Sequence, residues 1–266
     1  MGQVLMEQNR IDVAFQSKEG GLLTIYFTAG YPNLDDTVRI ASALEEAGAD
    51  IIEIGLPYSD PIADGPTIQE SSTQALKNGM SIMVLFEQLK TLRDHVTIPV
   101  LLMGYLNPVI QFGVETFCEK CNEVGVDGLI LPDLPIDEYA EIYKPIFDKH
   151  GLHNVFLVSP QTSETRIRMI DEKSTGFIYL VSSSSITGAK QGMTDEQVSY
   201  FKRIESMDLK SKKMIGFGIS SHDSYKTACE YSDGAIIGSA FIRELKNDPS
   251  DQNIHEFVKR IKSPEK

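Results

Sequence analysis

Eight short apolar runs recur along the chain, and each is followed by a turn that carries Gly, Pro or Asp. The runs are nearly continuous in Val, Ile and Leu, which is typical of parallel strands that are buried on both faces. The pattern therefore predicts eight buried strands. They are Leu22–Phe27, Ile51–Ile54, Pro99–Met103, Gly128–Leu131, Asn154–Val158, Phe177–Val181, Met214–Phe217 and Gly234–Ile237.

Segments with helical spacing lie between these runs. They are Leu34–Ala47, Ile82–His95, Val114–Glu123, Ile136–Lys149, Ser163–Glu172, Asp195–Ser206 and His222–Glu230, with a last one at Gln252–Ile261. Strands that alternate with helices imply right-handed crossovers and a parallel sheet. Eight such units in 266 residues favour an α/β fold of the (β/α)8 TIM-barrel type over an open doubly wound sheet. We expect one TIM-barrel domain over residues 1–266.

Three segments fall outside the regular repeat. Residues 3–17 precede the first strand, and we expect them to form an extra N-terminal helix that closes the bottom of the barrel. The connections after strands two and six, Gly55–Ile98 and Ser182–Lys213, are long, and we expect long loops after these two strands in addition to the helices. Long insertions at the carboxyl ends of barrel strands are where such enzymes keep lids and substrate loops.

Charge and hydropathy narrow the functional classes. The formal net charge of −13 argues against general nucleic-acid binding, because an acidic surface repels phosphate backbones. No apolar run approaches the ~20 residues that a membrane-spanning helix needs. The N-terminal sequence lacks a basic start followed by an apolar core, so no signal peptide is predicted. We therefore expect a cytoplasmic protein.

The cysteines and histidines do not indicate a metal site. Cys118 and Cys121 have metal-ligand or redox spacing, but no second pair or histidine lies near them in sequence. Both fall within the helical segment 115–124, where two small helix residues are the simpler interpretation. The five histidines lie mostly on helices or just past them. We predict no metal site.

Glu53 lies inside the second apolar run. A carboxylate in an apolar strand is costly to bury without a partner or a purpose. One interpretation is a structural glutamate paired with a cation, although no basic residue stands at a neighbouring strand end. The other is a general acid and base whose pKa is raised by the apolar neighbours Ile52, Ile54 and Leu56.

Two aspartates follow Glu53 on the loop that leaves this strand. Taken alone, Asp60 and Asp64 are loop aspartates of the kind that make turns. Their position close to Glu53 in sequence makes them candidates for paired acid–base chemistry.

Glycine-bearing turns follow strands seven and eight, where barrels often bind phosphate. Gly218 and Gly238 allow backbone N–H groups to approach an anion, and Ser220 and Ser239 can add hydroxyl donors or cap the following helices. An ordinary strand-to-helix turn would carry the same residues for capping. Two such turns, together with Gly188 after strand six, favour a phosphate site.

Two tyrosines and one further loop belong to the same end of the barrel. Tyr26 stands at the end of strand one and Tyr179 within strand six. Tyr179 can equally be a packed residue whose hydroxyl is satisfied at the rim. Residues 182–192, which include Thr187, form either a surface loop or a lid that closes over a substrate. Their position directly after strand six favours the lid.

Taken together, these motifs resemble the α subunit family of tryptophan synthase. The resemblance covers nearly the whole chain, and its most specific segment is 53–69. The matching segments are FTAGYP (27–32), EIGLPYSDPIADGPTIQ (53–69), GYLNPV (104–109), LPDLP (131–135), ITGA (186–189), GFGIS (216–220) and GSA (238–240). Many relatives carry an arginine and a glycine in the lid, where this chain has Ser183 and Ser185, and this difference bears on lid closure.

The resemblance implies a lyase of L-tryptophan biosynthesis that cleaves indole-3-glycerol phosphate to indole and glyceraldehyde 3-phosphate, without a metal or cofactor. It implies that Glu53 is the general acid and base, and that Asp64 steadies the positive charge that develops on the indole ring. The residues that it implies for substrate binding are Tyr26, Tyr179, Thr187, Gly188, Gly218, Gly238 and Ser239.

The resemblance also implies an αββα heterotetramer. Indole would pass through a tunnel to a β subunit that carries pyridoxal phosphate. We expect the surface that faces this subunit around Asp60, Asn107-Pro108 and residues 133–135. Two alternatives remain at this point. One is another phosphate-binding TIM-barrel enzyme, and the other is a non-catalytic regulatory subunit on the same scaffold.

Overall fold

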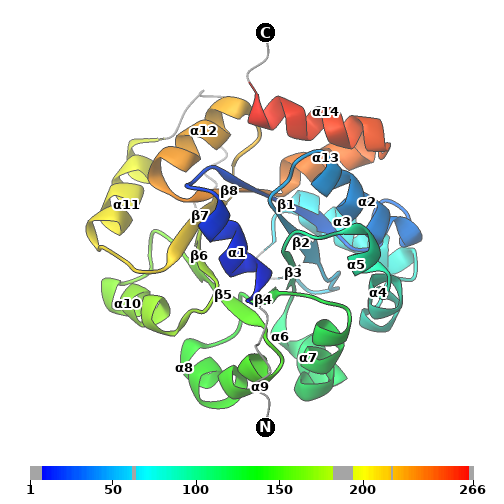
Figure 1. Cartoon of the computed structure of the whole chain (residues 1–266), viewed down its shortest axis with the longest axis horizontal. Coiled ribbons are helices and arrows are strands. Elements are labelled where there is room, and N and C mark those ends of the chain that lie inside the picture. The colour runs from blue at the N-terminus through cyan, green and yellow to red at the C-terminus, as the bar shows by residue number, and fades with distance from the viewer. Residues whose placement is uncertain (1–7, 62–63, 182–193, 217, 264–266) are drawn as a thin grey trace.

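The structure is a computed structural model that describes residues 8–61, 64–181, 194–216 and 218–263. Eight parallel strands form a closed barrel in which each strand pairs with the next and β8 pairs with β1. Figure 1 shows the helices arranged around this barrel, and the predicted (β/α)8 fold is confirmed. The strands are β1 Leu22–Thr28, β2 Ile51–Gly55, β3 Val100–Met103, β4 Gly128–Ile130, β5 His153–Val158, β6 Phe177–Val181, β7 Lys212–Gly216 and β8 Gly234–Ile237.

The helices are more numerous and shorter than the sequence pattern predicts. Those in the first half are α1 Arg10–Ser17, η1 Leu34–Asp36, α2 Thr37–Glu46, α3 Pro66–Lys77, α4 Ile82–Leu89, α5 Leu92–His95, α6 Leu106–Phe112 and α7 Val114–Glu123. Those in the second half are α8 Ile136–Glu138, η2 Tyr139–Tyr143, α9 Lys144–Lys149, α10 Glu164–Lys173, α11 Asp195–Ser206, α12 His222–Tyr231, α13 Ser239–Asn247 and α14 Asp251–Lys262. None of the described helices is long and apolar enough to cross a bilayer.

Several predicted boundaries were wrong. The expected helix at Ile82–His95 is divided between α4 and α5, and the one at Ile136–Lys149 contains the π-helical turn η2. The connection Gly55–Ile98 contains three helices, α3, α4 and α5, the first of which begins at Pro66. The first of these, α3, begins with Pro66 after Gly65, a favourable helix start that the apolar pattern did not reveal.

The extra N-terminal helix closes one end of the barrel. Asn9 caps α1 by accepting a hydrogen bond from the Ile11 amide. Ile11 and Phe15 are buried among the inward-facing strand residues, and the ring centroids of Phe15 and Phe177 lie 5.8 Å apart. Figure 1 shows α1 lying across the barrel opening. This apolar plug confirms the expected place of the helix, which begins at Arg10 rather than at residue 3, and residues 3–7 lie outside the described residues. It leaves the opposite, carboxyl end of the barrel for chemistry.

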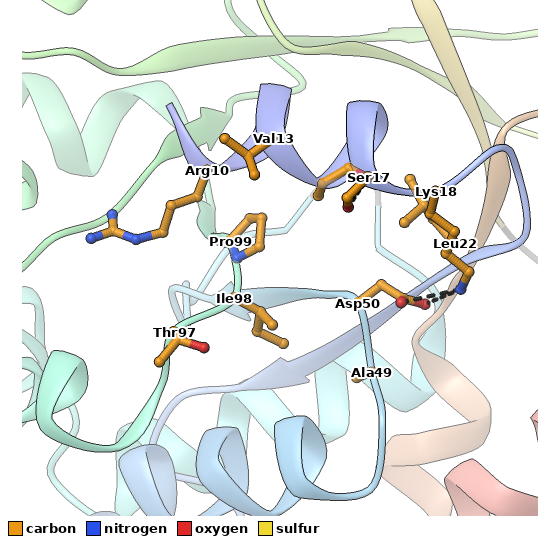
Figure 2. Close-up of a pocket in the computed structure, with 11 residues that line it drawn as sticks. Arg10, Val13, Ser17, Lys18, Leu22, Ala49, Asp50, Thr97, Ile98 and Pro99 are labelled. Carbon is orange, nitrogen blue, oxygen red and sulfur yellow. Dashed lines mark hydrogen bonds and ion pairs between the residues drawn. The ribbon is translucent and has the colours of Figure 1, made fainter. Parts of the chain in front are cut away.

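Ion pairs and a cavity also belong to this amino-terminal end. Asp127 accepts hydrogen bonds from Arg10, Arg93 and the Val100 amide, which ties α1 and α5 to the strands. A cavity of about 280 Å³ lies between α1 and the loops that enter β2 and β3, with Asp50 on its wall (Figure 2). Its lining includes none of the predicted site residues.

Candidate active site

Glu53 lies within the barrel at the middle of β2. Its neighbours in the strand ladder are Tyr26 on β1 and Leu101 on β3. The residue is completely buried, at 0% exposure. Because side chains alternate along a strand, Glu53 points to the face opposite that of Ile52 and Ile54.

The apolar wall predicted for Glu53 was therefore wrong. Ile52, Ile54 and Leu56 belong to the core that lies between the barrel and its helices, together with residues such as Leu44 on α2. Sequence neighbours of a strand residue face away from it, so they cannot enclose it. Burial inside the barrel, rather than contact with these residues, removes Glu53 from water.

No charged group among the described residues offsets this burial of Glu53. Among the residues that the structure describes, neither of its carboxylate oxygens has a hydrogen-bond partner. Burial raises the pKa of Glu53 to about 8, because the charged form loses its hydration. Glu53 is therefore mainly a neutral acid at pH 7, and it can give and take a proton near neutral pH.

Asp64 stands on the loop between β2 and α3 and is half-buried. The Tyr105 hydroxyl, just past β3, donates a hydrogen bond of 3.1 Å to Asp64 Oδ2. Burial raises the pKa of Asp64, and the Tyr105 hydrogen bond opposes that shift. The Tyr105 ring also packs against Tyr58 on the same loop, with ring centroids 5.2 Å apart. The loop between β2 and α3 is thus held against Tyr105.

Asp60 differs from the other two acids. It is exposed, and its carboxylate accepts a hydrogen bond of 2.6 Å from the adjacent Ser59 hydroxyl. The three acids therefore lie in three environments, which are the barrel interior, the half-buried loop and the surface. Burial raises the pKa of Glu53 and that of Asp64.

Tyr26 and Tyr179 stand close to both acids. Burial is the main cause that raises the pKa of each phenol, and the charges of Glu53 and Asp64 raise both pKa values further. Tyr26 lies beside Glu53 in the β1–β2 ladder, and Tyr179 belongs to the inner core of the barrel. The structure thus brings together four of the predicted site residues.

Two glycines make room for these rings. A β-carbon at Gly55 would lie 2.1 Å from the Tyr26 hydroxyl oxygen, and one at Gly216 would lie 2.3 Å from the Tyr179 hydroxyl oxygen. Real side chains do not approach so closely, so a larger residue at either position requires the tyrosine to move. Gly55 and Gly216 therefore fix where the two phenols stand over the barrel.

The predicted phosphate turns lie on neighbouring strands. Gly216 pairs with Ile236, and Gly218 and Gly238 each follow two residues later, so both turns leave the same end of the barrel. Gly218 has a φ of 77°, a left-handed conformation that favours glycine. Ser239 opens α13, whose N-cap is Gly238, and helix N-termini favour anions.

Helix capping differs from one of the predictions at these turns. Ser221 rather than Ser220 caps α12, by accepting a hydrogen bond from the Ser224 amide. Gly238 lies beside Tyr26, since a β-carbon there would be 3.4 Å from the tyrosine ring. The glycine turns therefore continue along the rim toward Tyr26 and Glu53.

The lid residues fall outside this description. Thr187 and Gly188, predicted to contact the substrate, and the lid serines Ser183 and Ser185 lie outside the described residues. In the described part of the chain, no group of three or more His, Cys, Asp or Glu side chains is arranged to hold a metal ion. Cys118 and Cys121 lie in α7, as the helical interpretation predicted, and burial raises both thiol pKa values.

One contact of the site was not predicted. Tyr105 lies in the segment GYLNPV (104–109), and the sequence indicates no role for its side chain. Its partner Asp64 lies 41 residues earlier in the chain. The available signal is positional, because residues that follow neighbouring barrel strands meet at the same rim.

This geometry supports acid–base chemistry on a small anionic substrate. A buried acid lies inside the barrel, a second carboxylate stands on the loop after β2, and two glycine turns follow β7 and β8. Two carboxyl groups in different environments can hold different protonation states at one pH.

Comparison with known proteins gives a consistent result. A family model described as "Tryptophan synthase alpha chain" matches residues 13–265. The tryptophan synthase alpha chain of Flavobacterium psychrophilum is 58% identical over 95% of this chain and 99% of its own length. That of Flavobacterium johnsoniae is 56% identical over 96% of this chain and 100% of its own length.

Solved structures agree with these matches. Tryptophan synthase subunit alpha from Legionella pneumophila is similar to this chain with a TM-score of 0.87 and 32% identity, over 96% of this chain and 97% of the other. The aminoacrylate-bound form of tryptophan synthase from M. tuberculosis contains a chain that is similar with a TM-score of 0.84 and 28% identity, over 96% of this chain and 98% of that one.

Proposed function

We propose that Glu53 and Asp64 divide the acid–base chemistry in this chain, which belongs to the tryptophan synthase alpha chain family. Its function is that of the family, a carbon–carbon lyase of L-tryptophan biosynthesis. The reaction is the retro-aldol cleavage of indole-3-glycerol phosphate to indole and glyceraldehyde 3-phosphate. The residue roles below are inferred from the site.

Glu53 is the group that moves the proton. In its neutral form it donates a proton to the indole ring carbon that carries the glycerol chain, which leaves a positive charge on the ring nitrogen. The resulting Glu53 carboxylate then removes the proton of the neighbouring glycerol hydroxyl. The O–H electrons form the aldehyde, and the electrons of the broken carbon–carbon bond return to the ring. Glu53 ends protonated, as it began.

Asp64 stabilises the charge that exists between these steps. As a carboxylate it accepts a hydrogen bond from the indole N–H, where positive charge is greatest in the intermediate. An interaction that strengthens as this charge develops lowers the barrier rather than only tightening binding. The hydrogen bond from Tyr105 supports this role, because it opposes the rise in the pKa of Asp64 caused by burial.

The remaining site residues bind and orient the substrate. Tyr26 and Tyr179 form walls for the indole and glycerol portions, and Gly218, Gly238 and Ser239 hold the phosphate at the start of α13. The phosphate is remote from the breaking bond, so its binding energy holds the substrate in register. Thr187 and Gly188 complete this set as a proposal that rests on the family resemblance alone.

We also infer that the chain acts in the cytoplasm as a single domain within an αββα complex. Its partner is a β subunit that carries pyridoxal phosphate and receives the indole. A chain of complete tryptophan synthase from M. tuberculosis is among the similar structures, which supports the partner. The surface expected to face it includes Asp60 and the loops after β3 and β4, which are joined by a hydrogen bond from the Leu106 amide to Asp133.

The observation that carries the proposal is a fully buried carboxyl group with a pKa of about 8 and no partner among the described residues. An indole-release assay on the complex with the β subunit tests it with Glu53→Gln and Asp64→Asn. Each variant should lower turnover by roughly a hundredfold or more, with unchanged circular dichroism. If either variant turned over at the wild-type rate, the role assigned to that residue would be wrong.

A further inference from the structure

A buried pair of hydroxyl groups joins the end of β1 to α3. The Thr28 and Ser71 hydroxyl oxygens lie 2.7 Å apart, and the two residues are 0% and 1% exposed. Ser71 also donates a hydrogen bond of 2.8 Å to the Ile68 carbonyl oxygen. A serine hydroxyl has one hydrogen, so Thr28 must be the donor in the bond to Ser71.

This pair is buried at the junction of β1 and α3, next to an apolar core. The core between the barrel and its helices is built from side chains such as Ile40, Leu44 and Phe117. A satisfied polar pair in such a layer fixes a contact geometry more strictly than apolar packing does, because any shift leaves a buried hydroxyl unpaired. The Thr28–Ser71 bond therefore sets the position of α3 along the barrel wall.

The helix that this bond fixes begins directly after Asp64. Gly65 is the N-cap of α3, and Pro66 is its first residue. The Gln69 side chain donates a hydrogen bond of 2.8 Å to the Asp64 carbonyl oxygen, and the Gln69 amide donates one of 3.0 Å to Gly65. The backbone of Asp64 is thus attached to the first turn of α3.

The other end of the bond belongs to the rigid frame that holds Glu53. In the β1–β2 ladder, Tyr26 pairs with Glu53 and Thr28 pairs with Gly55. Thr28 therefore stands on the strand next to Glu53, two residues farther toward the carboxyl end. The hydrogen bond between the two hydroxyls fixes the position of α3, and of Asp64 directly before it, relative to β1 and β2.

We propose that Thr28 and Ser71 are positioning residues, which hold the backbone of Asp64 at a fixed place relative to Glu53. This inference rests on the proposed role of Asp64. Tyr105 orients the Asp64 side chain from the other side, and the hydroxyl pair fixes the backbone. Neither Thr28 nor Ser71 contacts the reacting atoms.

The test compares two neighbouring buried serines of α3 in the complex with the β subunit. Ser71→Ala removes the hydrogen bond between Thr28 and Ser71, which we call the clamp. Ser72→Ala removes a hydroxyl for which the described structure shows no hydrogen bond, at a position that is 4% exposed. We expect Ser71→Ala to lower kcat for indole release by roughly ten- to a hundredfold with KM changed by less than about twofold. We expect Ser72→Ala to keep kcat within about twofold of wild type.

Variants of Thr28 test the same hydrogen bond from its other end. Thr28→Ser keeps the donor and should retain the wild-type kcat, whereas Thr28→Val removes it and should match Ser71→Ala. The double variant Thr28→Val/Ser71→Ala leaves neither hydroxyl of the pair without its partner, so it tests the clamp even if a single variant folds poorly. It should show the same loss of kcat as the single variants, because all three lack the bond between residues 28 and 71.

The outcomes separate this inference from the proposed function. If Asp64→Asn leaves kcat unchanged, the role of Asp64 fails and the clamp fails with it. If Asp64→Asn lowers kcat while Ser71→Ala and the double variant behave like Ser72→Ala, only the clamp is overturned. An equal loss of kcat in Ser71→Ala and Ser72→Ala would also overturn the clamp, because the effect would then come from any change in the buried face of α3.

Discussion

The Tyr105 hydroxyl donates a hydrogen bond of 3.1 Å to Asp64, so the residue that follows β3 holds the carboxylate on the loop that follows β2. Because the Tyr105 bond favours the ionised form of Asp64, it links the geometry of the loop to the charge that the reaction requires.

Replacement of Tyr105 by Phe should move the acid limb of the pH–rate profile. Without the hydrogen bond, the pKa of Asp64 rises further above its ordinary value, and the carboxyl stays protonated to a higher pH. Activity should therefore be lost at a higher pH on the acid side, and kcat/KM at neutral pH should fall roughly fivefold to tenfold. The measurement is kcat/KM for indole release across the pH range. An unchanged acid limb would contradict this role of Tyr105.

Replacement of Glu53 by Gln should alter how stability depends on pH. Glu53 has a pKa of about 8 in the folded chain and an ordinary value of 4.5. As pH rises from 4.5 toward 8, the unfolded chain releases this proton and the folded chain keeps it, so the folded state loses stability. Above about pH 8 the loss is complete.

The glutamine variant lacks this penalty, so it should be more stable than wild type at pH 8.5 by up to about 5 kcal/mol. The two proteins should differ far less at pH 4.5. Urea unfolding at both pH values checks this expectation. A constant difference between the proteins at the two pH values would show that Glu53 has an ordinary pKa.

Replacement of Gly55 by Ala should displace Tyr26. The new β-carbon would lie 2.1 Å from the Tyr26 hydroxyl oxygen, and such overpacking destabilises a core by roughly 1 to 3 kcal/mol. Combining Gly55→Ala with Tyr26→Leu should restore most of that stability in urea unfolding. Gly65→Ala is the matched control, because a β-carbon there meets nothing within 4 Å. Equal losses at Gly55 and Gly65 would refute the steric explanation.

Replacement of Gly218 by Ala should weaken phosphate binding. The backbone φ of 77° at Gly218 is strained for any residue with a β-carbon. A change in this turn should raise KM for indole-3-glycerol phosphate roughly tenfold and leave kcat within about twofold. A substrate analogue without the phosphate should be cleaved equally slowly by the variant and the wild type. A selective effect on the analogue would place the phosphate elsewhere.

The sequence predicted the barrel because its strands are buried on both faces, and such strands appear as apolar runs. It did not predict α3 because two of the residues that face the core, Ser71 and Ser72, are polar. The apolar pattern of that helix is therefore interrupted where the proposed clamp is formed. A periodicity analysis is least informative at a helix that buries hydroxyl groups.

For the candidate site, the sequence predicted the two acids but not their surroundings. Glu53 stands out because it interrupts an apolar run, and Asp64 because it follows closely on a loop. The apolar neighbours predicted for Glu53 were wrong, since Ile52 and Ile54 face the helices. The contact between Tyr105 and Asp64 joins residues from two strand ends, and only closure of the barrel brings them together.

Difference infrared spectroscopy of the complete chain can show whether Glu53 enters the reaction as a neutral acid. At pH 7 the wild-type protein should show a protonated carboxyl band that is absent from Glu53→Gln and that titrates near pH 8, in line with its pKa of about 8. A Glu53 band that disappears near pH 4.5, the ordinary value for a glutamate, would contradict the account.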